Sequence, residues 1–191
     1  CVAFVTVTLL CGEAAAATAV NSVLDGASKM VVGNTTLTSL SSNSAQSAFV
    51  ASVTGFSQVR DASAVLVYGS VISVRVDRAD AAACFAIVFN NANLYGASTC
   101  IVVSHCRVEV ATDRGWSALV AFIGETSILQ AGASIVFANV TASIAVTNNA
   151  ADQFAHFGFT DVKSQILLGS RVALLNTTAV MLVTTGSVFV H

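Results

Sequence analysis

The stretch Gly26-Ala27-Ser28-Lys29-Met30-Val31-Val32-Gly33-Asn34-Thr35-Thr36 returns in altered form at nearly constant intervals down to the C-terminus. Each copy opens with a turn of small residues that ends in serine, and a run rich in Val, Ile and Leu follows. The serines of the five copies, Ser28, Ser63, Ser98, Ser134 and Ser170, are separated by 35, 35, 36 and 36 residues. A period of about 20–50 residues is typical of a solenoid rather than of a globule with a single core.

Each repeat contains three apolar runs that favour β-strands. The first run has apolar residues two and four positions after the serine, the second alternates with a period of two, and the third precedes the next repeat. The two expected inward columns are Met30, Val65, Cys100, Val136 and Val172, and Val32, Val67, Val102, Ala138 and Leu174. A further apolar residue stands four positions before most of the serines, as in Leu24, Val59, Leu94 and Ile166.

Three stacked strands per repeat predict an all-β fold, a right-handed parallel β-helix of about five repeats of 35–36 residues. The period leaves open whether one repeat forms one large rung or two small ones. We expect residues 1–191 to form a single β-helical segment, a fragment of a longer repeat protein, with residues 1–27 as a degenerate leading repeat or cap. The main alternative for the alanine-rich residues 14–19 is a helical cap, because alanine has the highest intrinsic helix propensity.

The composition excludes several classes of function. Only 9% of the residues are charged and 55% are hydrophobic, against about 25% charged in a typical soluble domain. Polar residues nevertheless interrupt every apolar stretch before it reaches the 18 or so residues of a transmembrane helix. The net charge is −2, and the eight basic residues are scattered along the chain. They therefore form no basic cluster in the sequence that would indicate nucleic-acid binding.

The cysteines and histidines predict neither a metal nor a cofactor site. The five cysteines lack the spacing of zinc ligands and leave the redox compartment open, and His105 and His156 have no second ligand at metal spacing. Cys100 stands in an expected inward column and is therefore predicted to be a buried free thiol. Phosphate-binding loops and dinucleotide fingerprints are also missing from the sequence.

Three N-x-[ST] sequons begin at Asn34, Asn139 and Asn176, which follow the serines of their repeats by six, five and six residues. This shared phase, directly after the first strand, suits an exposed turn that carries N-linked glycans. The alternative is a ladder of stacked asparagine side chains that hydrogen-bond along the coil without sugar. Gly69 and Ser104 are expected at the equivalent position of the other repeats.

The most polar segment of each repeat follows the second strand, and these loops are expected to crowd one side of the stack. Two of them carry the pairs Asp77-Arg78 and Asp113-Arg114, 36 residues apart. Together with Trp116 and Gln153, these pairs form the candidate binding face.

The two carboxylates of this face also admit an enzymatic interpretation. On adjacent rungs about 4.8 Å apart, Asp77 and Asp113 could act as the acid and the nucleophile of a carbohydrate-active enzyme. We interpret the pairs first as a surface ladder of Asp and Arg side chains that compensate each other's charge.

The Gly-Ala-Ser openings, the Val-rich strands that end in Asn-x-Thr and the dominance of Ala, Val and Ser resemble the dispersed gene family surface proteins of trypanosomes. This resemblance implies a piece of a very large, N-glycosylated, β-helical surface protein with an adhesin-like role. Its membrane anchor would lie outside these residues, and its partners would be neighbouring repeats of the same chain and host-cell or matrix ligands or glycans. The repeats also resemble pectate-lyase-type β-helices, which include both enzymes and adhesins.

We therefore expect a non-enzymatic, structural and adhesive segment that is located at the cell surface or secreted. The alternative is a polysaccharide lyase or hydrolase that uses Asp77 and Asp113. A solenoid spacer whose loops bind nothing is a third hypothesis.

Overall fold

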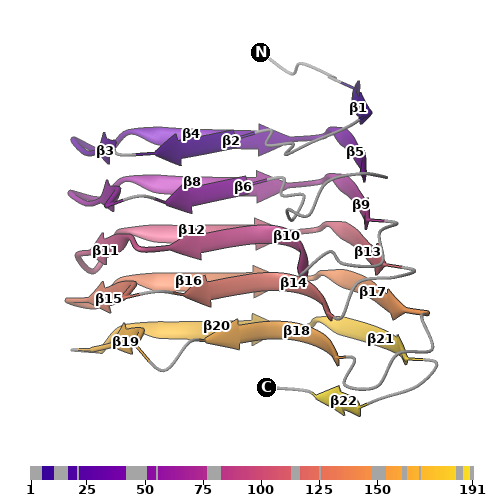
Figure 1. The fold of residues 1–191 in the computed structure, drawn as a ribbon. Helices are drawn as coiled ribbons and strands as arrows, with labels where there is room; N and C mark the ends of the chain where they lie inside the picture. The colour runs from indigo at the N-terminus through magenta and orange to yellow at the C-terminus, as the bar shows by residue number, and fades with distance from the viewer. Residues whose placement is uncertain are drawn as a thin grey trace.

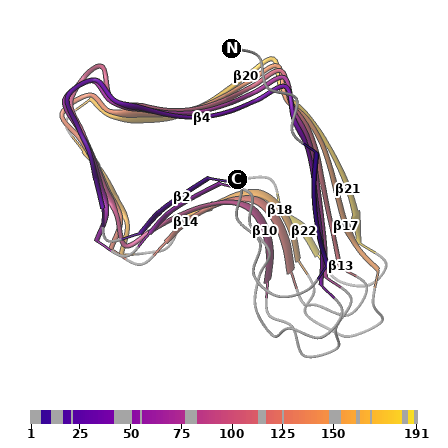
Figure 2. The same cartoon turned by 90° about the horizontal axis from the view of Figure 1, so that it is seen from above.

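The computed structural model of the 191-residue chain describes residues 6–10, 17–20, 22–41, 51–54, 56–76, 83–112, 117–124, 126–147, 154–160, 163–167, 169–183 and 187–189. These residues form parallel strands in four sheets, arranged as a stack of coils (Figure 1). Viewed along the stack, the coils nearly superimpose (Figure 2). The chain is therefore a parallel β-helix, as the repeat predicted.

Two sheets contain six strands each. Sheet A consists of β1 (Thr6–Leu10), β5 (Thr36–Ser41), β9 (Val71–Val76), β13 (Arg107–Thr112), β17 (Thr141–Val146) and β21 (Thr178–Val183). Sheet B consists of β2 (Ala17–Val20), β6 (Ala51–Thr54), β10 (Ala83–Asn90), β14 (Ser117–Gly124), β18 (Phe154–Thr160) and β22 (Ser187–Phe189).

The other two sheets contain five strands each. Sheet C consists of the short strands β3 (Val23–Leu24), β7 (Gln58–Val59), β11 (Asn93–Tyr95), β15 (Ile128–Gln130) and β19 (Gln165–Ile166). Sheet D consists of β4 (Lys29–Gly33), β8 (Ala64–Tyr68), β12 (Cys100–Ser104), β16 (Ser134–Ala138) and β20 (Arg171–Leu175).

Each repeat contributes one strand to each sheet, so one repeat forms one large rung with four strands and not three. Sheet C is the unexpected side of the coil. Its strands are only two or three residues long, which is too short to show the alternation that identifies a strand in a sequence. The sequence signal was the single inward residue of each strand, Val59, Leu94 or Leu129, each with 0% exposure.

The leading residues pair with the first full repeat. Strands β1, β2 and β3 each run parallel to their equivalents β5, β6 and β7. Residues 17–20 of the alanine-rich segment are thus a strand of sheet B, while residues 11–16 lie outside the described residues.

The register of sheet D corrects the expected inward columns. Its partners are Lys29, Ala64, Cys100, Ser134 and Arg171, which gives intervals of 35, 36, 34 and 37 residues. The third and fourth repeats are therefore out of phase with their serines: Thr99 and Ala133 stand at the corner where Ser98 and Ser134 were expected. Serine, threonine and alanine can replace one another at this corner. A shift of one residue in the strand register, in contrast, would turn the inward apolar side chains of sheet D outward.

The buried columns consequently run through different residues in these two repeats. The register partners are Met30, Val65, Ile101, Ile135 and Val172, and Val32, Val67, Val103, Phe137 and Leu174. Both columns are buried from the second to the fourth repeat, whereas Val172 and Leu174 of the last described coil are exposed. Cys100, Val102, Val136 and Ala138, which were predicted to point inward, are only half-buried.

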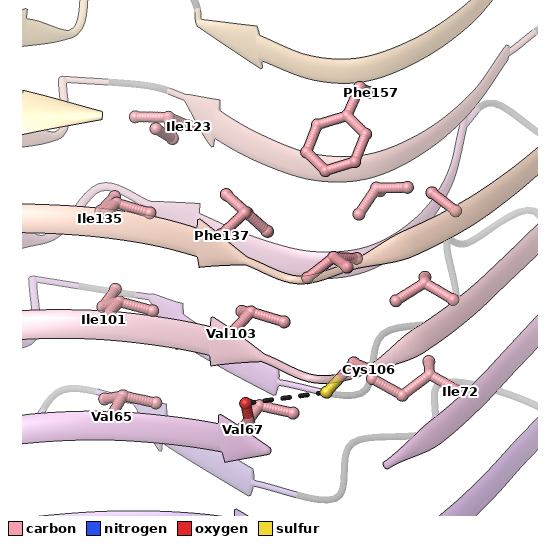
Figure 3. Packing of buried hydrophobic residues seen from close by; sticks show 14 of the residues in the cluster. Val65, Val67, Ile72, Ile101, Val103, Cys106, Ile123, Ile135, Phe137 and Phe157 are labelled. Carbon is pink, nitrogen blue, oxygen red and sulfur yellow. Dashed lines mark hydrogen bonds between the residues drawn. The ribbon is translucent and has the colours of Figure 1, made fainter. Parts of the chain in front are cut away.

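Side chains from opposite sheets fill the coil. Figure 3 shows Val65, Ile101 and Ile135 stacked in one column and Val67, Val103 and Phe137 in the next. The ring of Phe137 from sheet D meets the ring of Phe157 from sheet B edge to face, with centroids 5.2 Å apart and an interplanar angle of 82°. Among the described residues, the buried set contains no charged side chain, which explains the low charge content.

Buried serine hydroxyls hold the corners together. The Ser63 hydroxyl oxygen accepts a hydrogen bond from the Ser28 amide at 3.1 Å, 35 residues earlier. Ser70 accepts from the Thr35 amide at 3.3 Å and donates to the Tyr68 carbonyl oxygen at 2.8 Å. The Ser28 amide also donates to the Asp25 carbonyl oxygen at 3.1 Å, so the Ser63 hydroxyl adds a second acceptor there. Both hydroxyls link corners of successive coils, so these serines are structural.

The register makes a stability prediction that separates neighbouring residues. We expect Ile101→Ala, whose side chain is 3% exposed, to lower the free energy of unfolding by about 2–5 kcal/mol because it opens a cavity in the core. The control Val102→Ala, at a half-buried outward position, should cost less than about 1 kcal/mol. Urea unfolding measures both, and a larger loss for Val102→Ala would contradict this register.

Candidate functional site

The expected binding face lies outside the described residues. Asp77, Arg78, Asp113, Arg114, Trp116 and Gln153 all belong to the connections from sheet A to sheet B that the structure does not describe. The strands that lead to them are in register: Val76 and Thr112 are partners, and Asp77 and Asp113 follow them directly in the sequence. The 36-residue spacing of the two Asp-Arg pairs therefore equals the offset between register partners at the ends of β9 and β13.

The sequons share one column at the corner between sheets D and A. The column consists of Asn34, Gly69, His105, Asn139 and Asn176, which all adopt the left-handed conformation, with φ between 46° and 58°. The prediction that Ser104 belongs to this column was wrong by one position. His105 stands there instead, because the third repeat is one residue longer before this corner. Asparagine and glycine tolerate this conformation better than other residues, so the backbone itself selects them.

Side chains of this column form a hydrogen-bonded ladder. The Asn176 Nδ2 atom donates to Asn139 Oδ1 at 2.6 Å, and Asn139 Nδ2 lies 3.2 Å from His105 Nε2. Because an amide nitrogen only donates, this contact is a hydrogen bond in the tautomer whose Nε2 is unprotonated. We call Asn176, Asn139 and His105 the corner ladder.

The ladder and glycosylation are chemically compatible. Each Nδ2 carries two hydrogens and the ladder uses one of them, while a glycan replaces one. Asn139 and Asn176 are exposed and Asn34 is half-buried. In each sequon the threonine at the third position begins the next strand of sheet A, at Thr36, Thr141 and Thr178.

The two cysteines whose side chains are described are free thiols in different surroundings. Cys100 was predicted to be buried, but it is half-buried and points outward, because the register places it beside Ala64 and Ser134. Cys106 is the buried thiol, and its Sγ contacts the carbonyl oxygens of Ser104 at 3.2 Å and Val67 at 3.7 Å (Figure 3). Burial raises the pKa of both thiols, and at Cys100 the positive charge of Lys29 opposes that rise.

A depression of about 290 Å³ lies on the outer face of sheet C. Its lining residues are Gln58, Arg60, Asp61, Asn93, Tyr95 and Gln130, and we call it the sheet C depression. The Arg60 guanidinium contacts Asp25 at 3.3 Å and Asp61 at 3.7 Å. These residues carry no motif that marks them in the sequence. The available signal was position: Gln58, Arg60, Asn93, Tyr95 and Gln130 each stand one residue before or after the inward residue of a sheet C strand.

In the part of the chain that the structure describes, His, Cys, Asp and Glu side chains nowhere gather in a group of three that could hold a metal ion. Over the same residues, no helix has the length and apolar character needed to cross a lipid bilayer.

Comparison with protein-family models, with curated proteins and with solved structures found no match.

The thiols provide a labelling prediction. The thiolate is the reactive form, so burial should protect Cys106 more than Cys100. In the native protein at pH 8, we expect iodoacetamide to modify Cys100 at least about tenfold faster than Cys106, measured by mass spectrometry of the separate peptides. In urea the two rates should converge, whereas faster labelling of Cys106 in the native protein would contradict the described core.

The left-handed corner provides a second prediction. Asn139→Ala should lower the free energy of unfolding by about 1 kcal/mol, because alanine is strained at positive φ. Asn139→Gly removes the same hydrogen bonds but accepts the conformation, so its loss should stay below about 0.5 kcal/mol. Equal losses in urea unfolding would show that the hydrogen bonds, and not the backbone, dominate at this corner.

Proposed function

We propose that this chain is a structural and adhesive, non-enzymatic segment of a glycosylated protein that is secreted or displayed at the cell surface. The observation that carries the proposal is the coincidence of all three N-x-T sequons with one left-handed corner of a regular β-helix. The likeness of the repeats to the dispersed gene family surface proteins of trypanosomes supports the same assignment.

The architecture suits an extended structural element. Each coil contacts mainly its neighbours, and each further coil adds about 4.8 Å of length. The partners of one repeat are therefore first of all the adjacent repeats of the same chain. A rod of this kind presents its loops and corners in regular rows, and such rows favour repeated weak contacts with a surface.

The corner is suited to glycans because two of its asparagine side chains, Asn139 and Asn176, are exposed. The corner between sheets D and A precedes the sheet A strands, whereas Asp77 and Asp113 follow the ends of β9 and β13 in the sequence. The loops between sheets A and B carry Asp77, Arg78, Asp113, Arg114, Trp116 and Gln153, and we assign them to contact with host-cell or matrix ligands or glycans. The membrane anchor of such a protein would lie outside this segment.

A carbohydrate-active enzyme is the second candidate. It is favoured by the register of β9 and β13, which continues to the residues directly before Asp77 and Asp113. Cleavage of an acidic or neutral polysaccharide that is lost in Asp113→Ala would support it, and activity unaffected by that change would exclude this pair as the catalytic site.

Secretion from a eukaryotic host tests the glycosylation. We expect a mass shift that an endoglycosidase removes and that peptide mapping assigns to Asn34, Asn139 and Asn176. Thr141→Ala destroys the sequon of Asn139 but keeps the corner ladder, so it should lose one glycan, while Thr141→Ser should keep it. An unshifted protein from this host would argue strongly against the proposed function.

Adhesion is tested separately with beads that carry the purified chain. Binding to cells or matrix should weaken at least about fivefold in Trp116→Ala and Arg114→Ala, because aromatic and Arg side chains anchor recognition surfaces. If neither the unsubstituted chain nor the variants bind, the result favours the third hypothesis, a solenoid spacer whose loops bind nothing.

A further inference from the structure

The sheet C depression lies over three successive coils. Gln58 and Asn93 are register partners, and so are Tyr95 and Gln130. Val59 and Leu94 are also register partners, and Arg60 and Tyr95 directly follow them in the sequence. Arg60 and Tyr95 therefore lie in adjacent coils. The lining thus forms two short columns along the stack, with neighbouring side chains about one strand spacing, 4.8 Å, apart.

The floor of the depression is rigid. Val59, Leu94 and Leu129 stand between the lining residues in the sequence, and all three are fully buried with 0% exposure. Backbone hydrogen bonds hold the strands, such as Arg60 N to Leu24 O at 2.9 Å and Gly96 N to Gln130 O at 3.2 Å. The backbone that carries the lining side chains is therefore held in place before a ligand binds.

The lining offers hydrogen-bonding groups together with apolar surface. Three amide side chains, Gln58, Asn93 and Gln130, supply both donors and acceptors, and Arg60 and Asp61 add charged partners. The one aromatic residue, Tyr95, is 53% exposed and offers a flat apolar ring with a hydroxyl at its edge. This combination matches a ligand with many hydroxyl groups and some apolar C–H surface.

The charges favour a neutral ligand. The Arg60 guanidinium is already paired with Asp25 at 3.3 Å and Asp61 at 3.7 Å. These three groups together carry one net negative charge, which disfavours carboxylated or sulfated ligands. An extended peptide is also disfavoured, because the backbone groups of β11 already pair with β7 and β15, so no strand edge is free for it there.

We infer that the sheet C depression is a binding site for a neutral saccharide, with Tyr95 stacking on a sugar ring and Gln58, Asn93 and Gln130 bonding its hydroxyls. The volume of about 290 Å³ lies at the lower end of the range for small-molecule sites and suits a mono- or disaccharide. The strand spacing is close to the length of one sugar unit, so a longer glycan would run along the stack. The inference goes beyond the proposed function, because such a site would act whether or not the protein is displayed on a cell.

Titration of the full 191-residue chain, made in bacteria and therefore without N-glycans, tests the inference. The neutral probes are lactose, diacetylchitobiose and mannobiose, and the acidic probes are 3′-sialyllactose and a heparin disaccharide. At least one neutral probe should bind with a Kd of about 1 mM or lower by calorimetry. In the NMR spectrum of the unsubstituted protein, this probe should shift the amide signals of residues 58, 93, 95 and 130.

Matched variants locate the site. Tyr95→Ala should weaken binding at least about tenfold and Gln130→Ala at least about threefold, while Tyr95→Phe, which keeps the ring, should stay within about twofold. Gln165→Ala, an exposed glutamine of the same sheet outside the depression, should leave the Kd unchanged. Near-UV circular dichroism checks that the variants fold.

Three results would overturn the inference: binding of no neutral probe, binding of acidic probes alone, or shifts at residues away from sheet C. The NMR shifts use the unsubstituted chain, so the test stands even if a variant does not fold. Because the protein carries no glycan and is free in solution, failure here is distinct from failure of the proposed glycosylation and adhesion.

Discussion

Parallel pairing of each strand with its equivalent one repeat away is the constraint on which the whole structure depends. A backbone amide in one coil can be satisfied only if the next coil offers a carbonyl oxygen at the same place. The pairing therefore fixes which residues of different repeats stand in one column. Repeats of 34–37 residues all meet this condition, because the differences in length are absorbed outside the paired strands.

Several features of the sequence are consequences of that constraint. The inward columns must be apolar, so no charged side chain of the described residues is buried. The corner between sheets D and A must turn through a left-handed residue, which selects Asn or Gly in four of five coils and His105 in the remaining one. Both the corner ladder and the sheet C depression exist because outward side chains of adjacent coils are held about 4.8 Å apart.

The period, the parallel β-helix and most inward residues could be predicted from the sequence, because apolar residues recur at fixed phases. The register of the third and fourth repeats could not, since serine, threonine and alanine are interchangeable at the corner and Ser98 and Ser134 mislead by one residue in opposite directions. The same error made the predictions for Cys100, as a buried thiol, and for Ser104, as a member of the corner column, wrong. Sheet C could not be predicted, because strands of two or three residues are too short to show a period. For the same reason the depression around Tyr95 could not be predicted. The loop residues from Asp77 to Gln153 that were singled out as a binding face remain predictions.

The central claim is that one repeat forms one coil, with Ile101 stacked on Ile135. Nuclear Overhauser contacts between the methyl groups of isoleucine-labelled protein test it most directly. The account predicts a strong contact between the Ile101 and Ile135 methyl groups, because the two residues are register partners and both point inward. Absence of a contact between the Ile101 and Ile135 methyl groups in the folded protein would contradict it.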